Sequence, residues 1–113
     1  MSKKLEAIFF SSSSGKEPVK AFFKKELNDN ETKKIYTAIR TIEISWPLGK
    51  PLVDHLKKNI WEIRCSHKNR ITRILFGITG KEMVLLHGFV KKTQKTPAKE
   101  LALAEKRLNE YEK

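Results

Sequence analysis

The stretch 61-WEIRCSHKNRITRILFGITGKEMVLLHGFVKK-92 decides the expected fold of this 113-residue chain. Together with residue 60 it holds three runs, at 60–66, 71–78 and 82–90, that are rich in the β-branched, aromatic and other apolar residues typical of strands. Only short polar turns separate the runs. Turns of this length join antiparallel neighbours, so the stretch predicts an antiparallel meander of three strands.

The third run is apolar along both of its alternating sides. Successive strand residues point to opposite faces of a sheet. The two expected faces are Met83, Leu85 and Phe89 against Val84, Leu86 and Val90. A strand with two apolar faces needs cover on both of them, so this strand is expected in the middle of the sheet.

Upstream of this stretch, the sequence predicts a strand and a helical hairpin. Residues 5–10 have the composition of a strand, which the polar run that follows them ends. A helix is expected from Pro18 to Leu27, since proline suits the first helical position. After the breakers Asn28, Asp29 and Asn30, apolar residues recur at helical spacing. This second stripe comprises Ile35, Ala38, Ile39, Ile42 and Trp46.

Two segments complete the expected topology. Residues 47–59 contain two prolines and a glycine and are expected to be irregular. Thr96 and Pro97 are expected to cap and start a final helix. The prediction is one domain over residues 1–113, with an α+β fold: a small antiparallel sheet, an N-terminal helical hairpin and a C-terminal helix. The inner stripe of the final helix is expected to hold Leu101, Ala104, Leu108 and Tyr111.

The charge of the chain is strongly positive and unevenly distributed. The formal net charge is +11 and the pI is about 9.9. From Arg64 to Lys99 there are nine basic residues and one acid, Glu82. Such an excess favours a polyanionic partner: nucleic acid, an acidic protein or an anionic membrane. The basic residues in this region are Arg64, Lys68, Arg70, Arg73, Lys81, Lys91, Lys92, Lys95 and Lys99.

The sequence gives little support for membrane insertion, disulfides or metal chemistry. The apolar run near the N-terminus is too short for a signal-peptide core or a membrane span, and the single cysteine, Cys65, suits a reducing cytosol. We therefore expect a cytoplasmic protein. His55, His67 and His87 share no metal-ligand spacing, and no nucleophile motif or Gly-rich phosphate loop is present. The Arg, Lys and His side chains remain as the candidates for function.

Strand alternation sorts these candidates onto faces. Arg64 shares a polar face with Glu62 and Ser66. Arg73 lies in mid-strand between apolar neighbours, where a guanidinium is costly to desolvate unless an anion accompanies it. Arg73 is therefore either a phosphate ligand or half of an ion pair with Glu62 or Glu82.

A second set of candidates lies on the third strand. His87, Phe89 and Lys91 are expected to share one face. Histidine titrates near neutral pH, so His87 is the best candidate for an acid or a base. A histidine in a strand also occurs as a hydrogen-bonded structural residue, and both interpretations stay open at this point.

Three segments of the chain resemble the phage Gp49-like or HigB branch of the RelE/ParE toxin superfamily. They are Trp61-Glu62-Ile63-Arg64, then Arg73-Ile74-Leu75-Phe76, and 85-LLHGFVKKTQKTP-97. The resemblance implies a RelE-like fold and the toxin of a type II toxin-antitoxin pair, which enters the ribosomal A site and cleaves mRNA without metal or cofactor. It also implies a helix-turn-helix, HigA-like antitoxin, with operator DNA contacted only through the toxin-antitoxin complex.

The resemblance also suggests a role for individual residues. Arg64 matches a basic strand residue of the RelE active site, and Arg73 matches the arginine that holds the scissile phosphate. Lys91 and Lys92 match a basic pair after the last strand. These four residues and His87 are the predicted catalytic set.

The identity of the general base stays open among His87, Glu62 and a lysine, because Glu62 stands where RelE has a lysine and the late tyrosine of RelE has no clear counterpart. The remaining basic residues near the expected groove are predicted to bind RNA, and Phe89 either stacks on a base or belongs to the core. The predicted RNA-binding residues are Lys68, Arg70, Phe89 and Lys95. Two other functions stay open: a ParE-like inhibitor of DNA gyrase and a non-catalytic basic RNA-binding domain.

Overall fold

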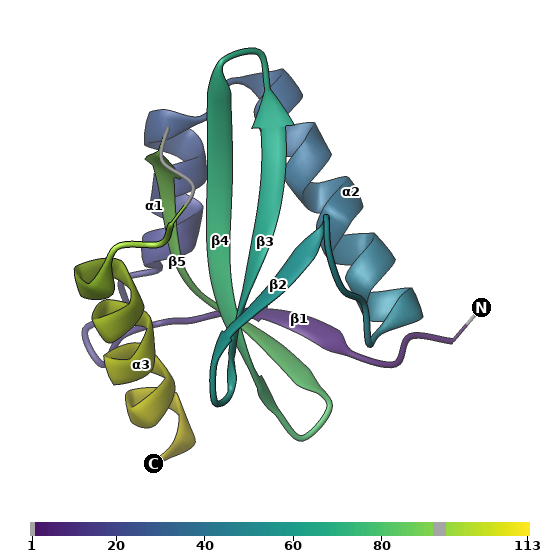
Figure 1. The fold of residues 1–113 in the computed structure, drawn as a ribbon. Helices are drawn as coiled ribbons and strands as arrows, with labels where there is room; N and C mark the ends of the chain where they lie inside the picture. The colour runs from purple at the N-terminus through teal and green to yellow at the C-terminus, as the bar shows by residue number, and fades with distance from the viewer. Residues whose placement is uncertain (1, 92–94) are drawn as a thin grey trace.

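The computed structural model describes residues 2–91 and 95–113. The described residues form one five-stranded mixed sheet and three helices (Figure 1). In chain order the elements are β1 (Glu6–Phe9), α1 (Pro18–Glu26), α2 (Asp29–Ser45), β2 (Val53–Lys57), β3 (Ile60–His67), β4 (Arg70–Thr79), β5 (Glu82–Lys91) and α3 (Ala98–Glu112).

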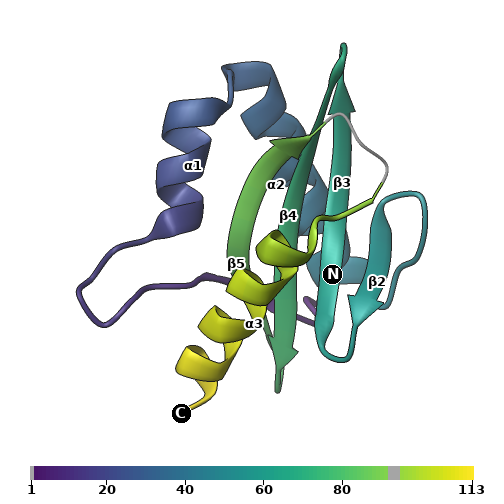
Figure 2. The same cartoon turned by 60° about the vertical axis from the view of Figure 1, so that its left-hand side comes forward.

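The predicted meander forms the middle of the sheet. The strand order is β1-β5-β4-β3-β2, and β3, β4 and β5 pair antiparallel in sequence order. The central position predicted for the third strand is also confirmed, since β5 lies between β4 and β1. Helices α1 and α2 cover one face of the sheet and α3 covers the other, as the turned view shows (Figure 2).

Two details of the predicted sheet are wrong. Segment 47–59 is not wholly irregular, because β2 pairs antiparallel with β3 inside it. This strand is a short, polar edge strand, which sequence pattern does not distinguish from a loop. The sheet is not purely antiparallel either, because β1 pairs parallel with β5, from Glu6 opposite Glu82 to Phe9 opposite Leu85. The helices and strands between β1 and β5 bring the chain back to this edge of the sheet. The pairing of β1 with the distant β5 therefore decides that the two strands run parallel.

Local signals explain where two of the helices begin. Pro18 is the first residue of α1, as expected. At the start of α2, the Asn28 side chain accepts a hydrogen bond from the Glu31 N–H, and the Glu31 carboxylate accepts one from the Asn28 N–H. Helix α3 differs from the prediction, because Pro97 occupies the cap position. The Thr96 hydroxyl contacts Glu62 and Arg73 in the sheet instead.

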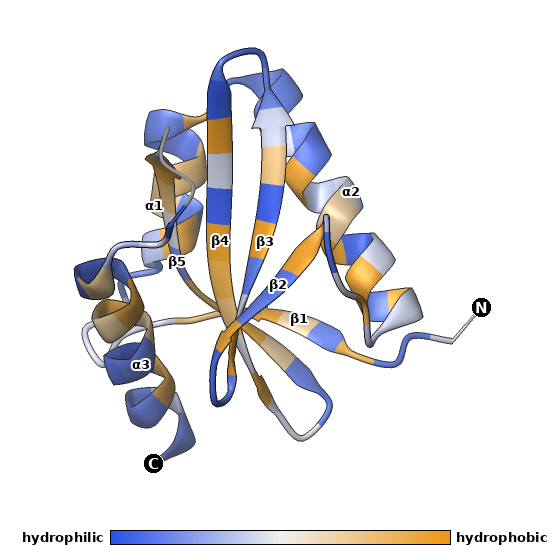
Figure 3. Cartoon of the chain, viewed as in Figure 1, coloured by the Kyte–Doolittle hydropathy of each residue, from blue (hydrophilic) through white to orange (hydrophobic). Residues whose placement is uncertain are grey.

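Apolar side chains form a separate core on each face of the sheet. Polar residues occur in the first part of β4, whereas the run from Ile74 to Phe76 is hydrophobic throughout and supplies side chains to both faces (Figure 3). The core under α1 and α2 comprises Leu5, Val19, Phe23, Ile35, Ala38, Ile39, Ile42, Val53, Ile63, Ile74, Phe76, Met83 and Leu85. The smaller core under α3 comprises Phe10, Ile60, Leu75, Val84, Leu86, Phe89, Ala104 and Leu108.

A β-bulge in β5 changes which residues face each side of the sheet, so the faces predicted for that strand are wrong beyond the bulge. Leu75 of β4 pairs with His87, but the next residue, Phe76, pairs with Leu85, so Leu86 is an extra residue. An extra residue reverses the side-chain alternation beyond it. Phe89 therefore packs under α3, whereas the prediction placed it on the same face as Leu85.

Candidate functional site

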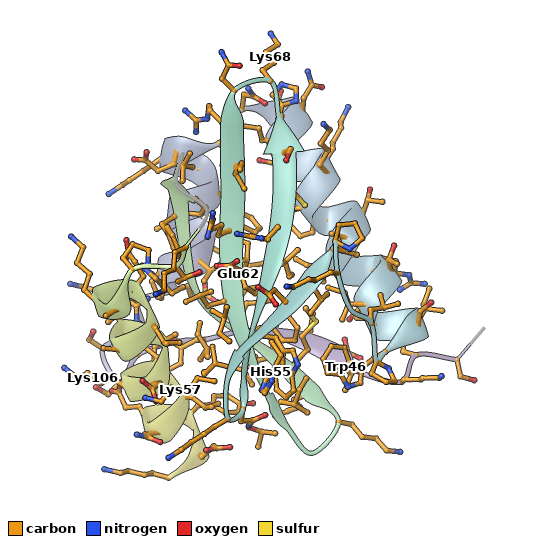
Figure 4. All side chains as sticks on the ribbon, in the orientation of Figure 1. Trp46, His55, Lys57, Glu62, Lys68 and Lys106 are labelled. Carbon is orange, nitrogen blue, oxygen red and sulfur yellow. The ribbon has the colours of Figure 1, made fainter. Side chains whose placement is uncertain are left out.

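Charged side chains gather on the α3 face, where two rows of residues cross the three central strands. In one row Arg64, Arg73 and Phe89 lie opposite one another on β3, β4 and β5. In the next row Glu62, Leu75 and His87 do the same. Glu62 lies in the middle of the sheet in Figure 4. This register brings most of the predicted catalytic side chains that the structure describes into one area.

Glu62 is the centre of a buried ionic cluster. The side chains of Glu62 and Arg73 are both 0% exposed, and Arg73 Nη1 lies 3.6 Å from Glu62 Oε2. Arg64 Nε lies 3.0 Å from Glu62 Oε1, and its side chain is 26% exposed. Thr96 Oγ1 accepts a hydrogen bond of 3.3 Å from Arg73 Nη1 and donates one to Glu62. One carboxylate thus faces two guanidinium groups, which leaves a net positive charge.

A second polar cluster joins β5 to α3. His87 Nε2 lies 2.7 Å from Glu100 Oε1, and both side chains are largely buried, at 15% and 16% exposure. Arg107 Nη1 donates a 2.8 Å hydrogen bond to the Leu86 carbonyl and lies 3.4 Å from His87 Nδ1. The rings of His87 and Phe89 stack with their centroids 5.5 Å apart. The imidazole is thereby held on three sides.

An open groove lies beside the ionic cluster. It has a volume of about 340 Å³, and Arg64 contributes to its wall. A cavity of this size can take part of a nucleotide. Its other lining residues are Pro51, Leu52, Ser66 and Ile71.

The chain also matches a known protein family. Residues 22–109 match the model of the phage-derived Gp49-like protein family, DUF891. The chain belongs to this family. Gp49-like proteins are part of the RelE/ParE-like superfamily of toxin-antitoxin toxins, so the predicted family is confirmed. No curated protein matches the chain.

The predicted catalytic residues of this Gp49-like protein occupy different environments. Arg64 faces the groove, whereas Arg73 is sealed in the ion pair with Glu62 that the sequence left open as an alternative. His87 lies under α3 with its ring nitrogens facing Glu100 and Arg107. Of the predicted basic pair, Lys91 is the last residue of β5, and Lys92 lies outside the described residues.

The predicted RNA-binding residues do not form one patch. Lys68 is exposed at the tip of the β3–β4 hairpin, as labelled in Figure 4. Arg70 bonds instead to the turn between α1 and α2, with Nε 2.9 Å from Glu31 Oε2 and Nη2 2.7 Å from the Glu26 carbonyl. Phe89 is only 8% exposed, which fits the core position considered for it. Lys95 is exposed just before α3.

Sequence reasoning missed three residues of this Gp49-like site. Thr96 was taken for a helix cap, and Glu100 and Arg107 were not considered. The signal for the last two was their spacing in α3, where they lie four residues before and three after the buried Ala104. Charged residues that flank an inward stripe in this way reach the same sheet face as the stripe.

Three further observations concern the described residues of this Gp49-like protein. Burial lowers the pKa of Arg107 from its ordinary value, and the charge of Glu110 acts in the opposite direction. Among the residues that the structure describes, no group of three His, Cys, Asp or Glu side chains is arranged to hold a metal ion. Within the same residues, no helix is long and apolar enough to cross a membrane.

Proposed function

We propose that this Gp49-like toxin is a RelE-like, ribosome-dependent mRNA endoribonuclease, related in action to HigB. The observation that carries the proposal is the sheet register. It brings His87, with its carboxylate partner, next to the row that holds Arg64 and Arg73. A titratable group beside fixed positive charge is what cleavage of a phosphodiester requires. The family implies a cognate antitoxin, and we propose a helix-turn-helix, HigA-like protein for that role.

The proposed reaction uses the RNA's own 2'-hydroxyl as nucleophile. The 2'-oxygen forms a bond to the adjacent phosphorus, the bond from phosphorus to the 5'-oxygen breaks, and a 2',3'-cyclic phosphate remains. In net terms one proton moves from the 2'-hydroxyl to the leaving 5'-oxygen. Only RNA carries this hydroxyl, which restricts the substrate to RNA.

The exposure of each described residue suggests its role in the proposed reaction. Arg64 lines the groove and can contact a phosphate directly, where its planar guanidinium stabilises developing negative charge. Arg73 is buried, so in this conformation it holds Glu62 in place and acts on the RNA through the local electrostatic field. His87 is the candidate for the acid or base of the reaction, and its Nε2 contacts the Glu100 carboxylate. Exposed lysines such as Lys68 would add salt-dependent affinity for ribosomal or messenger RNA.

One observation favours a second function, inhibition of DNA gyrase. Glu62 and Arg73 form a fully buried ion pair. A buried ion pair is as compatible with a structural role as with a catalytic one. A toxin that acts by binding alone needs no exposed catalytic group. In that case the basic surface would serve contact with a protein or with DNA.

Primer extension on a translated mRNA in a cell-free system tests the proposal. The variants are Arg64→Ala and His87→Ala, with Arg40→Ala as a matched control, because Arg40 is an exposed arginine on α2 across the sheet. We expect the wild type and the control to cut ribosome-bound mRNA, and both site variants to cut it more slowly. Intact mRNA with the wild type would overturn the nuclease, and inhibition of gyrase supercoiling would then establish the second function.

A further inference from the structure

Glu100 and Arg107 contact His87 from helix α3, and no role follows for them from the reaction described above. We infer that they are positioning residues, which select, for the neutral form of the His87 imidazole, the tautomer with its proton on Nε2. This inference rests on the proposed function for its catalytic consequence. The tautomer itself follows from geometry alone.

The carboxylate determines which nitrogen carries the proton. An ionised carboxylate only accepts hydrogen bonds, so the 2.7 Å contact from Glu100 Oε1 places a proton on Nε2 of His87. On the other side of the ring, a guanidinium only donates. Arg107 Nη1 lies 3.4 Å from Nδ1, which must therefore present its lone pair. Both neighbours select the same tautomer.

The surroundings also fix the orientation of the ring. Phe89 stacks on the imidazole with an interplanar angle of 26°. Arg107 is itself anchored by its 2.8 Å hydrogen bond to the carbonyl of Leu86, the bulge residue just before His87. The ring is thus held by three neighbours, and a flip that exchanged the nitrogens would break the short bond to Glu100.

This arrangement makes Nδ1 the basic atom of the site. In the proposed cleavage, a histidine with Nε2–H can accept the proton of the 2'-hydroxyl only at Nδ1, so the 2'-hydroxyl has to displace Arg107 Nη1, which lies 3.4 Å from that atom. Glu100 would then face the imidazolium and stabilise the charge that develops. The side chains that face His87 are Glu100 and Arg107 of α3 and Phe89 of β5, so the titratable groups around it carry one negative and one positive charge.

Imidazole ¹⁵N shifts, recorded on the intact protein at mildly alkaline pH, test the tautomer without reference to activity. We expect the Nε2–H pattern for His87 in the wild type, and a mixture of tautomers in Glu100→Ala. Glu100→Gln keeps an acceptor oxygen and should retain most of the Nε2–H form. Glu105→Gln is the matched control, since Glu105 lies on the same helix in an exposed pair with Lys57 and should leave His87 unchanged.

Cleavage kinetics of the same variants test the catalytic consequence. We expect Glu100→Ala to lower kcat about 10- to 100-fold with little change in KM, and Glu100→Gln to recover part of the loss. An Nδ1–H pattern in the wild type, or no tautomer change in Glu100→Ala, would overturn the inference whatever the activity. Wild-type protein that shows the expected tautomer but cuts no mRNA would instead overturn the proposed function and, with it, the catalytic use of Nδ1.

Discussion

Replacing Glu62 with glutamine removes one negative charge from an ionic cluster in which Glu62 and Arg73 are both completely buried. Glutamine has nearly the same shape and keeps an oxygen that can accept the hydrogen bond from Thr96. The change therefore tests the effect of the negative charge alone. It leaves the fully buried guanidinium of Arg73 without the carboxylate 3.6 Å away, and Arg64 without the one at 3.0 Å.

The expected cost is large because Arg73 is completely buried. Removing one member of a buried ion pair costs about 3–5 kcal/mol, since the remaining charge stays in a medium of low polarity. For a chain of 113 residues, an unfolding entropy of about 2.1 cal/mol/K per residue converts this loss into a fall in Tm of about 13–21 °C. The contribution of Arg64 is smaller, because its side chain reaches solvent.

Thermal unfolding followed by circular dichroism, together with urea titration, measures this loss. Glu105→Gln provides the control, because its partner Lys57 is about half exposed and such a pair contributes about 0–1 kcal/mol. The double variant Glu62→Leu with Arg73→Met should regain most of the stability, since replacing both charges with apolar groups is often neutral. If Glu62→Gln melts within about 3 °C of the wild type, the reasoning about the buried pair is refuted.

Three further predictions concern other parts of the fold. The hydrogen bond from Tyr111 to Glu82, aided by burial, raises the pKa of the phenol. Tyr111→Phe should cost about 1 kcal/mol at neutral pH. The difference in urea midpoint should begin to fall above about pH 10, where the unfolded phenol ionises, and be lost at higher pH as the native phenol ionises too. Gly88→Ala places a methyl group 2.5 Å from the Phe22 ring and should cost about 1–3 kcal/mol in thermal unfolding. Burial raises the pKa of the Cys65 thiol, so iodoacetamide should alkylate it more slowly in the native protein than in urea, as mass spectrometry will show.

Matched changes separate these effects from general damage to the protein. Gly49→Ala adds the same methyl group where no atom lies within 4 Å, so it should leave Tm nearly unchanged. Equal losses at Gly49 and Gly88 would contradict the packing argument. For Tyr111, a stability difference that persists at strongly alkaline pH would contradict the assigned hydrogen bond. For Cys65, equal alkylation rates in buffer and in urea would contradict its burial.

The sequence by itself determined the local elements and the chemical character of this protein. The pattern of apolar residues predicted four strands and three helices, because side-chain alternation and helical stripes follow from backbone geometry alone. The motifs of the central strands determined the family. The concentration of basic residues between Arg64 and Lys99 predicts an anionic partner.

Only the tertiary structure decided how these elements combine into a site. The parallel pairing of β1 and the edge strand β2 depend on contacts between residues far apart in the sequence. The bulge at Leu86 is decisive, because without it His87 would share the face of Leu85 under the helical hairpin. With it, His87 meets Glu100 and Arg107 of α3. No local pattern specifies that extra residue, since its place is set by the packing of both cores at once.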